Sequence, residues 1–598
     1  MTEDNSTQYL LDKIASLENE LRSVKKYGLV WDKEKVPEKI VSDCINNIPV
    51  LSHVVEKDVN QGGIEHLVIE GDNFQSLLCL KMTDQELFDF VYIDPPYNLG
   101  KSDFKYNDKY VEAEDTYKHS KWLNMMEKRL SLARSLMKPQ ASIFISIDDH
   151  ECFDLKLLCD QIFGASNFVA LLPTIMNLKG NNSEIGFAGT HEYTLVYSKN
   201  YPPYLSEFPM SDDEIDGEWK QDNDGYYKKG AGLKASGEDD SRADRPFCFY
   251  PFLIRGNKLS MITEEEYKSL YDKTTKQFND DNLRQLEKKY DELGYGLIIP
   301  KTKTGYGRWR WAYDTSCKDL DEILVEASPK SVTLYKKQRP QLGDLPTKKP
   351  KSVFYKKEYS SGNGTNQLLK VIGPNNFNNP KPLQLIKDFI TIGCPPNGSV
   401  LDFFAGSGTT AQAVLELNSE DKKSKRKFTI LQCSENGIID TVTYPRVKTV
   451  LTGKRADGTE YGKPMKASIR YYRAETIPRD PNTDQSKYNL VTKVDSLLCI
   501  MEETYEVVEI ADNYAHYVSS DNMRHTLIYN DYYSESQFEV FKNKVLSVSG
   551  NKVVYVFSLD NTVDKTIFEG LPDIVVKPIP SKIFEIYQEV TECLKRGD

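Results

Sequence analysis

Residues 400–410 read Val-Leu-Asp-Phe-Phe-Ala-Gly-Ser-Gly-Thr-Thr. An apolar run that ends in Asp402, followed by a short glycine turn and a helix start, is typical of an α/β sheet with a ligand at its carboxyl edge. Gly406 and Gly408 let the backbone approach a ligand closely, and Thr409 or Thr410 can cap the helix. The spacing of dinucleotide sites and the lysine of P-loops are both absent. The stretch therefore predicts a site for an adenosine-bearing cofactor.

Residues 91–98 read Val-Tyr-Ile-Asp-Pro-Pro-Tyr-Asn. The apolar run predicts a strand with Asp94 at its carboxyl end, and Pro95 and Pro96 fix a stiff, extended loop with free carbonyls. Asp94 and the Pro95 carbonyl can accept both hydrogens of a planar exocyclic amine, while Tyr97 stacks on the ring that bears it. An ordinary Pro-Pro turn with a capping aspartate is the structural alternative. The full tetrapeptide behind an apolar strand favours the chemical interpretation.

Apolar, strand-like runs alternate with amphipathic, helix-like runs in two stretches of the chain, 61–199 and 377–452. Alternation of this kind is typical of a parallel sheet covered by helices on both faces, so we predict an α/β fold. The expected strands are 66–70, 88–93, 141–147, 399–403 and 427–432, and the expected helices are 121–138, 155–163, 383–392 and 409–417.

The other segments predict a multidomain chain, because 598 residues exceed the roughly 150 of an average domain. We expect an N-terminal helical segment at 1–60, which either packs on its own domain or forms a short coiled coil between subunits. Its apolar residues fall on one helical stripe: Leu10, Ile14, Leu17, Leu21 and Val24. The remaining predictions are an insertion at 200–376, a connector at 453–490 and a C-terminal α/β domain at 491–598, available for dimerisation or partner contact, with a last helix at 582–595.

The composition limits the classes of function. Lys and Arg number 77 against 89 Asp and Glu, so attraction of the whole chain to nucleic acid or to an anionic membrane is not expected. The longest apolar runs are far shorter than the ~20 residues that cross a bilayer. Ten cysteines without a C-x-x-C pair indicate neither a zinc ribbon nor a disulfide framework. We expect a cytoplasmic protein with no structural metal.

A local excess of positive charge interrupts this acidic background. Residues 301–357 hold 14 Lys and Arg against 6 Asp and Glu, interleaved with Trp309 and Trp311. Basic and aromatic residues in one segment favour contacts to phosphates and base edges, although a solvated surface with packed tryptophans is the structural alternative. The candidate DNA-binding residues are Arg308, Arg310, Lys336, Lys337, Arg339, Lys348, Lys349 and Lys351.

Together the two motifs resemble those of the DNA amino-methyltransferases, which use S-adenosylmethionine. Their order here, with the catalytic motif first and a long insertion before the cofactor motif, is similar to the beta class, whose insertion is the target-recognition domain. The resemblance implies a methyltransferase sheet with circularly permuted motif order and adenine-N6 specificity, with cytosine-N4 as the alternative. It implies that Asp94, Pro95, Pro96 and Tyr97 are catalytic. The implied cofactor contacts are Asp72, Lys381, Asp402, Phe403, Phe404, Gly406, Gly408, Thr409 and Glu435.

The chain further resembles the modification subunit of type III restriction-modification systems, in segments such as 27–31, 309–311 and 469–472. The resemblance implies binding of double-stranded DNA, a homodimer and a separate helicase-nuclease restriction subunit. A target adenine must then be flipped out of the duplex to reach the catalytic residues. A stand-alone methyltransferase and a DNA-binding specificity module without catalysis stay open as alternatives.

Overall fold

The computed structural model describes residues 38–558, except for 84, 101–104, 107–108, 113, 181–185, 211, 329–330, 341–345 and 481–482, together with residue 31 and short pieces between 563 and 583. The chain forms two compact units, one of Met1–Ser206 with Pro350–Asp598 and the other of Glu207–Lys349. In the described part of the chain, no helix has the length and apolar character needed to cross a membrane. The predicted stripe from Leu10 to Val24 lies outside the described residues.

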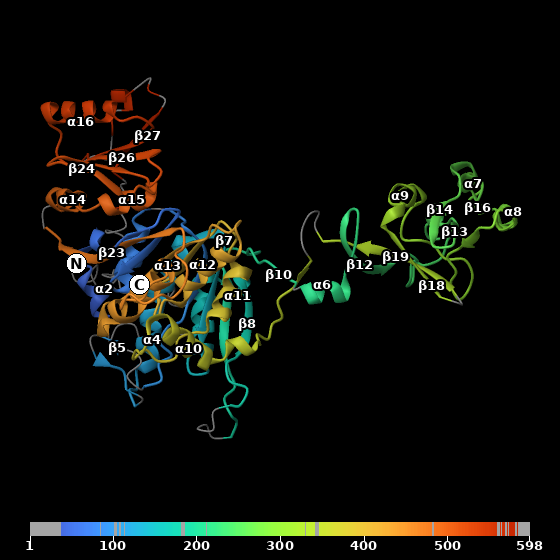
Figure 1. Ribbon diagram of the computed structural model, residues 1–598, viewed down its shortest axis with the longest axis horizontal. Coiled ribbons are helices and arrows are strands. Elements are labelled where there is room, and N and C mark those ends of the chain that lie inside the picture. Colours follow the sequence, from blue (N-terminus) through green and yellow to red (C-terminus); the bar gives the residue numbers. More distant parts are fainter. Residues whose placement is uncertain are drawn as a thin grey trace, which may run out of the picture. The chain divides into compact units, whose positions relative to one another are not determined.

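A ten-stranded sheet forms the centre of the first unit (Figure 1). Its six middle strands, β23, β3, β22, β21, β4 and β7, run parallel. The strands in sheet order are β1 (Asn47–His53), β23 (Ala467–Pro478), β3 (Ile64–Glu70), β22 (Lys427–Gln432), β21 (Ser399–Asp402), β4 (Phe88–Ile93), β7 (Met137–Ile147), β9 (His191–Ser198) and β8 (Phe168–Ile175), and β2 (Val59–Asn60) pairs with β23.

Helices cover both faces of this sheet, because alternate residues of the buried strands are apolar on both sides. Val91 and Ile93 of β4 belong to the core cluster that also holds Leu77 and Leu130. Tyr92 points to the opposite face, where its ring lies 6.1 Å from that of Phe389. The first face carries α3 (Asn73–Lys81), α4 (Lys118–Leu136) and α5 (Cys152–Phe163), and the second carries α11 (Leu383–Gly393), α12 (Thr409–Glu420) and α13 (Tyr444–Thr452). The predicted α/β architecture is confirmed.

Three predictions about strands are wrong. Residues 47–53 were expected within a helical segment but form β1, and only the short helix α2 (Lys39–Asp43) precedes it among the described residues. The predicted connector 453–490 contains β23, which lies inside the sheet between β1 and β3. The sheet is also not wholly parallel, since β1, β9 and β8 run antiparallel to their neighbours.

The second unit, Glu207–Lys349, is shorter than the predicted insertion 200–376. Residues beyond 349, including α10 (Ser361–Ile372), belong to the first unit, where α10 packs against α13. Trp309 and Tyr250 lie in the core of the second unit. Its main elements are the sheet β11 (Lys220–Asp222), β12 (Gly225–Gly232), β19 (Ser331–Gln338), β18 (Ile323–Ser328), the sheet β14 (Lys258–Met261), β13 (Phe252–Arg255), β17 (Gly296–Ile298), the pair β10 (Phe208–Pro209), β20 (Thr347–Lys348), and helices α6 (Asp212–Glu218), α7 (Glu264–Lys268), α8 (Asp280–Glu292) and α9 (Tyr313–Lys318).

The C-terminal segment forms a separate five-stranded sheet with helices on both sides (Figure 1). Tyr529 faces Phe541 of α16, whereas the neighbouring Ile528 packs in the cluster that holds Leu498 of α15. The elements are α14 (Thr483–Val491), α15 (Asp495–Glu502), β24 (Glu506–Ile510), β25 (Tyr514–Val518), β26 (Arg524–Tyr529), α16 (Glu535–Ser547), β27 (Asn551–Val556) and β28 (Ile574–Pro578). The predicted last helix lies almost wholly outside the described residues.

Candidate active site at the carboxyl edge of the sheet

The two sequence motifs meet at one edge of the central sheet. Strands β4 and β21 are parallel neighbours, with Leu401 opposite Val91. Asp94 directly follows β4, and Asp402 is the last residue of β21. Because the carboxyl ends of parallel strands lie at the same edge, residues far apart in the chain come together there. The predicted juxtaposition of the motifs is confirmed.

Asp94 lies in a cluster of polar side chains with Tyr97, Lys381 and Glu192. The Tyr97 hydroxyl lies 2.9 Å from Asp94 Oδ1 and 3.1 Å from Glu192 Oε2. Lys381 Nζ lies 2.6 Å from Glu192 Oε2, 3.3 Å from Asp94 Oδ1 and 2.5 Å from the Tyr97 hydroxyl. Two carboxylates therefore share one ammonium group and one hydroxyl donor.

Burial governs the protonation of this cluster. It raises the pKa of Asp94, and the Glu192 carboxylate raises it further, while Lys381 and Tyr97 act in the opposite direction. Burial also raises the pKa of Tyr97 well above its ordinary value, so the hydroxyl keeps its proton. Although burial alone would lower the pKa of Lys381, the Asp94 and Glu192 carboxylates raise it. The two carboxylates therefore favour the charged form of Lys381.

Neighbouring residues fix the proline loop that follows Asp94. Trp122 Nε1 donates to the Pro96 carbonyl at 2.7 Å. Asn98 adopts a φ of 60°, and its side chain donates to Glu151 Oε1 at 2.6 Å. Among the residues that the structure describes, no donor reaches the Pro95 carbonyl. The loop thus presents a carboxylate and one free carbonyl, that of Pro95, whereas the sequence predicts free carbonyls at both prolines and the Pro96 carbonyl is paired.

The glycine loop after β21 is a close-fitting turn. Gly406 and Gly408 have φ values of 49° and 78°, in the left-handed region that favours glycine. Gly406 N donates to Gln432 Oε1 at 2.7 Å, and the Thr443 hydroxyl donates to the Gly406 carbonyl at 2.6 Å. A Cβ at Gly406 would lie 3.2 Å from Phe377, and one at Gly408 would lie 3.3 Å from the Thr443 carbonyl. This backbone cradle fits a nucleoside-bearing group such as the cofactor predicted from the sequence.

Asp402 stabilises this turn through hydrogen bonds to residues on both sides of the glycines. Its side chain is buried, and its oxygens accept from the Phe404 amide at 3.0 Å and from the Thr410 hydroxyl at 2.5 Å. Burial raises the pKa of Asp402 to about 7. In this structure the Asp402 carboxylate therefore stabilises the loop that follows it. Direct contact of Asp402 with a cofactor stays a prediction.

Arg446, on the helix α13, supports the glycine loop, and no motif in the sequence indicates this residue. Its Nη1 donates to the hydroxyls of Ser407 and Thr409 at 3.0 and 2.7 Å, and its Nε donates to Gln412 Oε1 at 2.7 Å. Arg446 is fully buried, and burial lowers its pKa to about 10. Arg446 lies on α13, whereas its partners lie in the glycine loop and in the first turns of α12.

The other predicted cofactor residues lie along the same edge. Asp72 precedes α3, where Oδ1 accepts from the Phe74 amide at 2.8 Å and caps the helix. Phe403 is buried in the core, and Phe404 is half-buried. Glu435 is exposed just beyond the end of β22. The predicted roles of these residues stay predictions.

The predicted DNA-binding residues do not form one cluster. Lys337 and Arg339 contact Asp222, and Arg339 also contacts Glu322. In contrast, Arg310 and Lys336 have no carboxylate partner among the described residues; Lys336 Nζ lies 4.8 Å from the Trp311 ring centre. Arg308 donates to the Asp239 carbonyl at 2.7 Å, and Lys351 lies in the first compact unit rather than the second.

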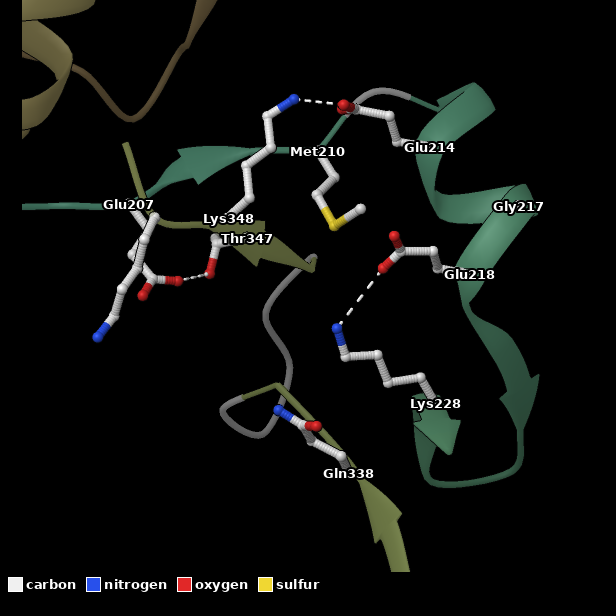
Figure 2. A pocket seen from close by; sticks show the side chains of 10 residues that line it. Glu207, Met210, Glu214, Gly217, Glu218, Lys228, Gln338, Thr347 and Lys348 are labelled. Atoms are coloured by element: carbon white, nitrogen blue, oxygen red, sulfur yellow. Dashed lines mark hydrogen bonds and ion pairs between the residues drawn. The ribbon is translucent and has the colours of Figure 1, made fainter. Parts of the chain in front are cut away.

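Lys348 and Lys349 line an open pocket of about 540 Å³ within the second unit (Figure 2). Figure 2 shows Lys348 paired with Glu214 and Lys228 facing Glu218. Because carboxylates balance lysines in this pocket, it is not a cationic surface. Lys348 is therefore a poor candidate for a phosphate contact.

Glu192 was missed by sequence analysis. The stretch His191-Glu192-Tyr193 begins an apolar strand and carries no motif. Strand β9 runs antiparallel to β7, with Tyr193 opposite Ile147 at the end of β7. An antiparallel strand begins where its parallel neighbours end, so its first residues lie at the active-site edge. Only the direction of this strand could have identified Glu192.

Several known proteins are similar in sequence to this chain. The Mod subunit of the type III restriction-modification enzyme EcoPI, from Escherichia phage P1, is 37% identical over 456 residues, which are 71% of this chain and 66% of that subunit. The type II methyltransferase M.KpnI from Klebsiella pneumoniae is 32% identical, over 62% of this chain and 81% of its own length. The solved structure of the cytosine-N4-specific PvuII DNA methyltransferase aligns with a TM-score of 0.30 and 10% identity, over 65% of this chain and 92% of that one.

A family model described as DNA methylase, for N6 and N4 enzymes, matches residues 88–421. These residues include the proline loop after Asp94, the whole inserted unit and the glycine loop with α12. The matched region therefore contains every element that forms the shared sheet edge between β4 and β21. The chain belongs to the DNA methylase family.

Proposed function

We propose that this chain is a site-specific DNA methyltransferase that transfers a methyl group from S-adenosylmethionine to the N6 amine of adenine. The observation that carries the proposal is the pairing of β4 with β21, since it sets Asp94 and the glycine loop at one edge. An amine acceptor site and a nucleoside cradle at the same edge suit transfer between two bound molecules.

The catalytic loop orients and activates the amine. The Asp94 carboxylate and the Pro95 carbonyl accept its two hydrogens, which opposes delocalisation of the nitrogen lone pair into the ring. The Tyr97 ring supports the base by stacking. The rigid loop, held by Trp122 and Asn98, fixes this geometry before the base arrives.

The cofactor supplies the electrophilic methyl group when bound. The backbone at Gly406 and Gly408 would lie against it, with Asp72 and Glu435 at the neighbouring strand ends as acceptors for its polar groups. Asp402 and Arg446 hold the cradle in shape from the protein side.

Adenine must leave the duplex to reach Asp94, at a cost of a few kcal/mol. We infer that the second unit binds double-stranded DNA through Arg308, Arg310 and Lys336, whose charges no carboxylate neutralises among the described residues. Arginine can read guanine edges and lysine can contact phosphates.

We also infer a role as the modification subunit of a type III restriction-modification system in the cytoplasm. The Mod subunits of EcoPI, EcoP15I and StyLTI among the relatives support this role. It implies a homodimer and a separate restriction subunit with the helicase and nuclease activities. The aligned region covers 66% of the EcoPI subunit, and the rest of that subunit supplies no support.

Sequencing that detects modified bases tests the activity in cells that express this chain. We expect N6-methyladenine at one fixed sequence motif, and its complete loss in Asp94→Ala. The matched control is Asp281→Ala, which removes an 81% exposed carboxylate on α8 and should leave the signal intact. N4-methylcytosine would contradict the base assignment, and modification that survives Asp94→Ala would contradict the proposed site.

A further inference from the structure

Glu192 stands at the centre of the candidate active site without a role in the reaction described above. Its carboxylate is 29% exposed and contacts the two donors that also contact Asp94. The ammonium of Lys381 lies nearer to Glu192, at 2.6 Å, than to Asp94, at 3.3 Å. The Tyr97 hydroxyl lies 3.1 Å from Glu192 and 2.9 Å from Asp94.

These contacts conflict with the task of Asp94. Both donors contact Oδ1 of Asp94, so this oxygen is not free to accept a hydrogen from the target amine, whereas Oδ2 has no partner among the described residues. The amine can use both oxygens of Asp94 only when the two donors move to another acceptor. Lys381 is only 8% exposed, and a buried ammonium group without a carboxylate partner is strongly unfavourable. The donors need a second acceptor in the same place.

We propose that Glu192 is a positioning residue that retains Lys381 and the Tyr97 hydroxyl while the target amine occupies Asp94. The inference rests on the proposed methyl transfer and deepens it. Lys381 already contacts Glu192 more closely, so it frees Oδ1 of Asp94 by the loss of its longer contact alone. The residue touches neither the base nor the methyl group and acts through its two donors.

Lys381 is the group through which loss of the Glu192 charge affects Asp94. Without that charge, Asp94 is, among the described residues, the one remaining carboxylate in contact with this buried cation. Their attraction then competes directly with the hydrogen bond from the amine. Removal of Lys381 relieves this competition, so a second substitution at Lys381 should repair part of the damage done at Glu192.

The experiment is a double-mutant cycle on single-turnover methyl transfer, at saturating cofactor and DNA. Glu192→Gln keeps the size of the side chain and removes its charge. We expect it to slow the transfer on the order of 100-fold, as expected for displaced catalytic groups, with the dissociation constants for S-adenosylmethionine and DNA unchanged. Glu192→Asp keeps the charge and should recover part of the rate.

The double variant Glu192→Gln/Lys381→Met should transfer methyl faster than Glu192→Gln alone. A merely structural role for Glu192 predicts instead that the two losses multiply, and that result would overturn the inference. A full rate in Glu192→Gln would also overturn it. An inactive wild-type chain, or an active Asp94→Ala, would refute the proposed function itself, so the two failures are distinguishable. Should Glu192→Gln not fold, the cycle is run with Glu192→Ala, which also removes the charge.

Discussion

Asp402 shows how one buried side chain makes stability depend on pH. Because burial raises the pKa of Asp402 from 3.8 to about 7, the folded chain binds a proton more tightly than the unfolded chain does. This contribution to stability is complete below about pH 3.8 and is lost as the pH rises through about 7. Asp402→Asn removes the titration. Relative to wild type, its free energy of unfolding should rise with pH between 4 and 7, by up to about 1.4 kcal/mol per pH unit.

Urea unfolding of both proteins at pH 4.5, 5.5, 6.5 and 7.5 measures this difference. Asp421→Asn is the control, because Asp421 is exposed at the end of α12 in the same compact unit. It should follow the wild-type pH dependence throughout. If Asp402→Asn also follows it, Asp402 is ionised in the folded chain at all these pH values.

At the scale of elements, the loop between β21 and α12 depends on the absence of a side chain at Gly408. A Cβ there would lie 3.3 Å from the Thr443 carbonyl and 3.4 Å from Val447, on the helix that supports the loop. We expect Gly408→Ala to shift the cradle and weaken S-adenosylmethionine binding by roughly 10-fold or more, since a 1.4 kcal/mol change corresponds to a factor of ten.

Isothermal titration of the cofactor measures this effect. Gly62→Ala is the matched control, because Gly62 also has a positive φ, of 68°, but a Cβ there meets open space. It should lower stability by about 1 kcal/mol through backbone strain and leave cofactor affinity unchanged. Equal cofactor affinity in the two variants would show that contact with α13 does not shape the cradle.

The strands differ in how far sequence could identify them. Strands β4 and β22 contain the unbroken buried stretches 90–93 and 428–431 because helices cover both faces of the sheet, and their predicted bounds match the structure. Strand β23 was missed because Arg470 and Arg473 interrupt its pattern. Arg470 pairs with Asp58 and Glu65, and Arg473 with Glu70, all distant in sequence. Local periodicity cannot reveal such partners.

The same limit applies to the candidate site. The two motifs that are predicted to meet ligands, at Asp94 and Gly406, could be recognised because a stiff loop and a tight turn each need a particular local sequence. Glu192, Arg446 and the role of Lys381 beside Asp94 depend on strand direction and on contacts between distant segments. Strand direction and contacts between distant segments follow from the assembled fold, and no short stretch of sequence predicts them.

For the whole molecule, the question is how a chain with net negative charge binds DNA, which is also negatively charged. The chain carries 89 acidic against 77 basic residues, so its overall field repels DNA. Binding must then rest on local cations that no carboxylate neutralises. In the second unit Arg310 and Lys336 meet this condition among the described residues, whereas Lys337, Arg339 and Lys348 are paired with carboxylates.

The salt dependence of DNA affinity separates these two groups. Each lost phosphate contact lowers the slope of log K against log salt by about 1, because one counterion fewer is released. Arg310→Ala/Lys336→Ala should therefore reduce the slope by about 1 to 2 and weaken binding.

The control Arg284→Ala/Lys268→Ala removes the same two side-chain types from the same unit. Each of these two residues is exposed and is paired with a carboxylate of its own helix. Fluorescence anisotropy across a salt series should give the wild-type slope for this control, because each cation it removes is already neutralised. Equal slopes in both variants would place the path of the DNA away from Arg310 and Lys336.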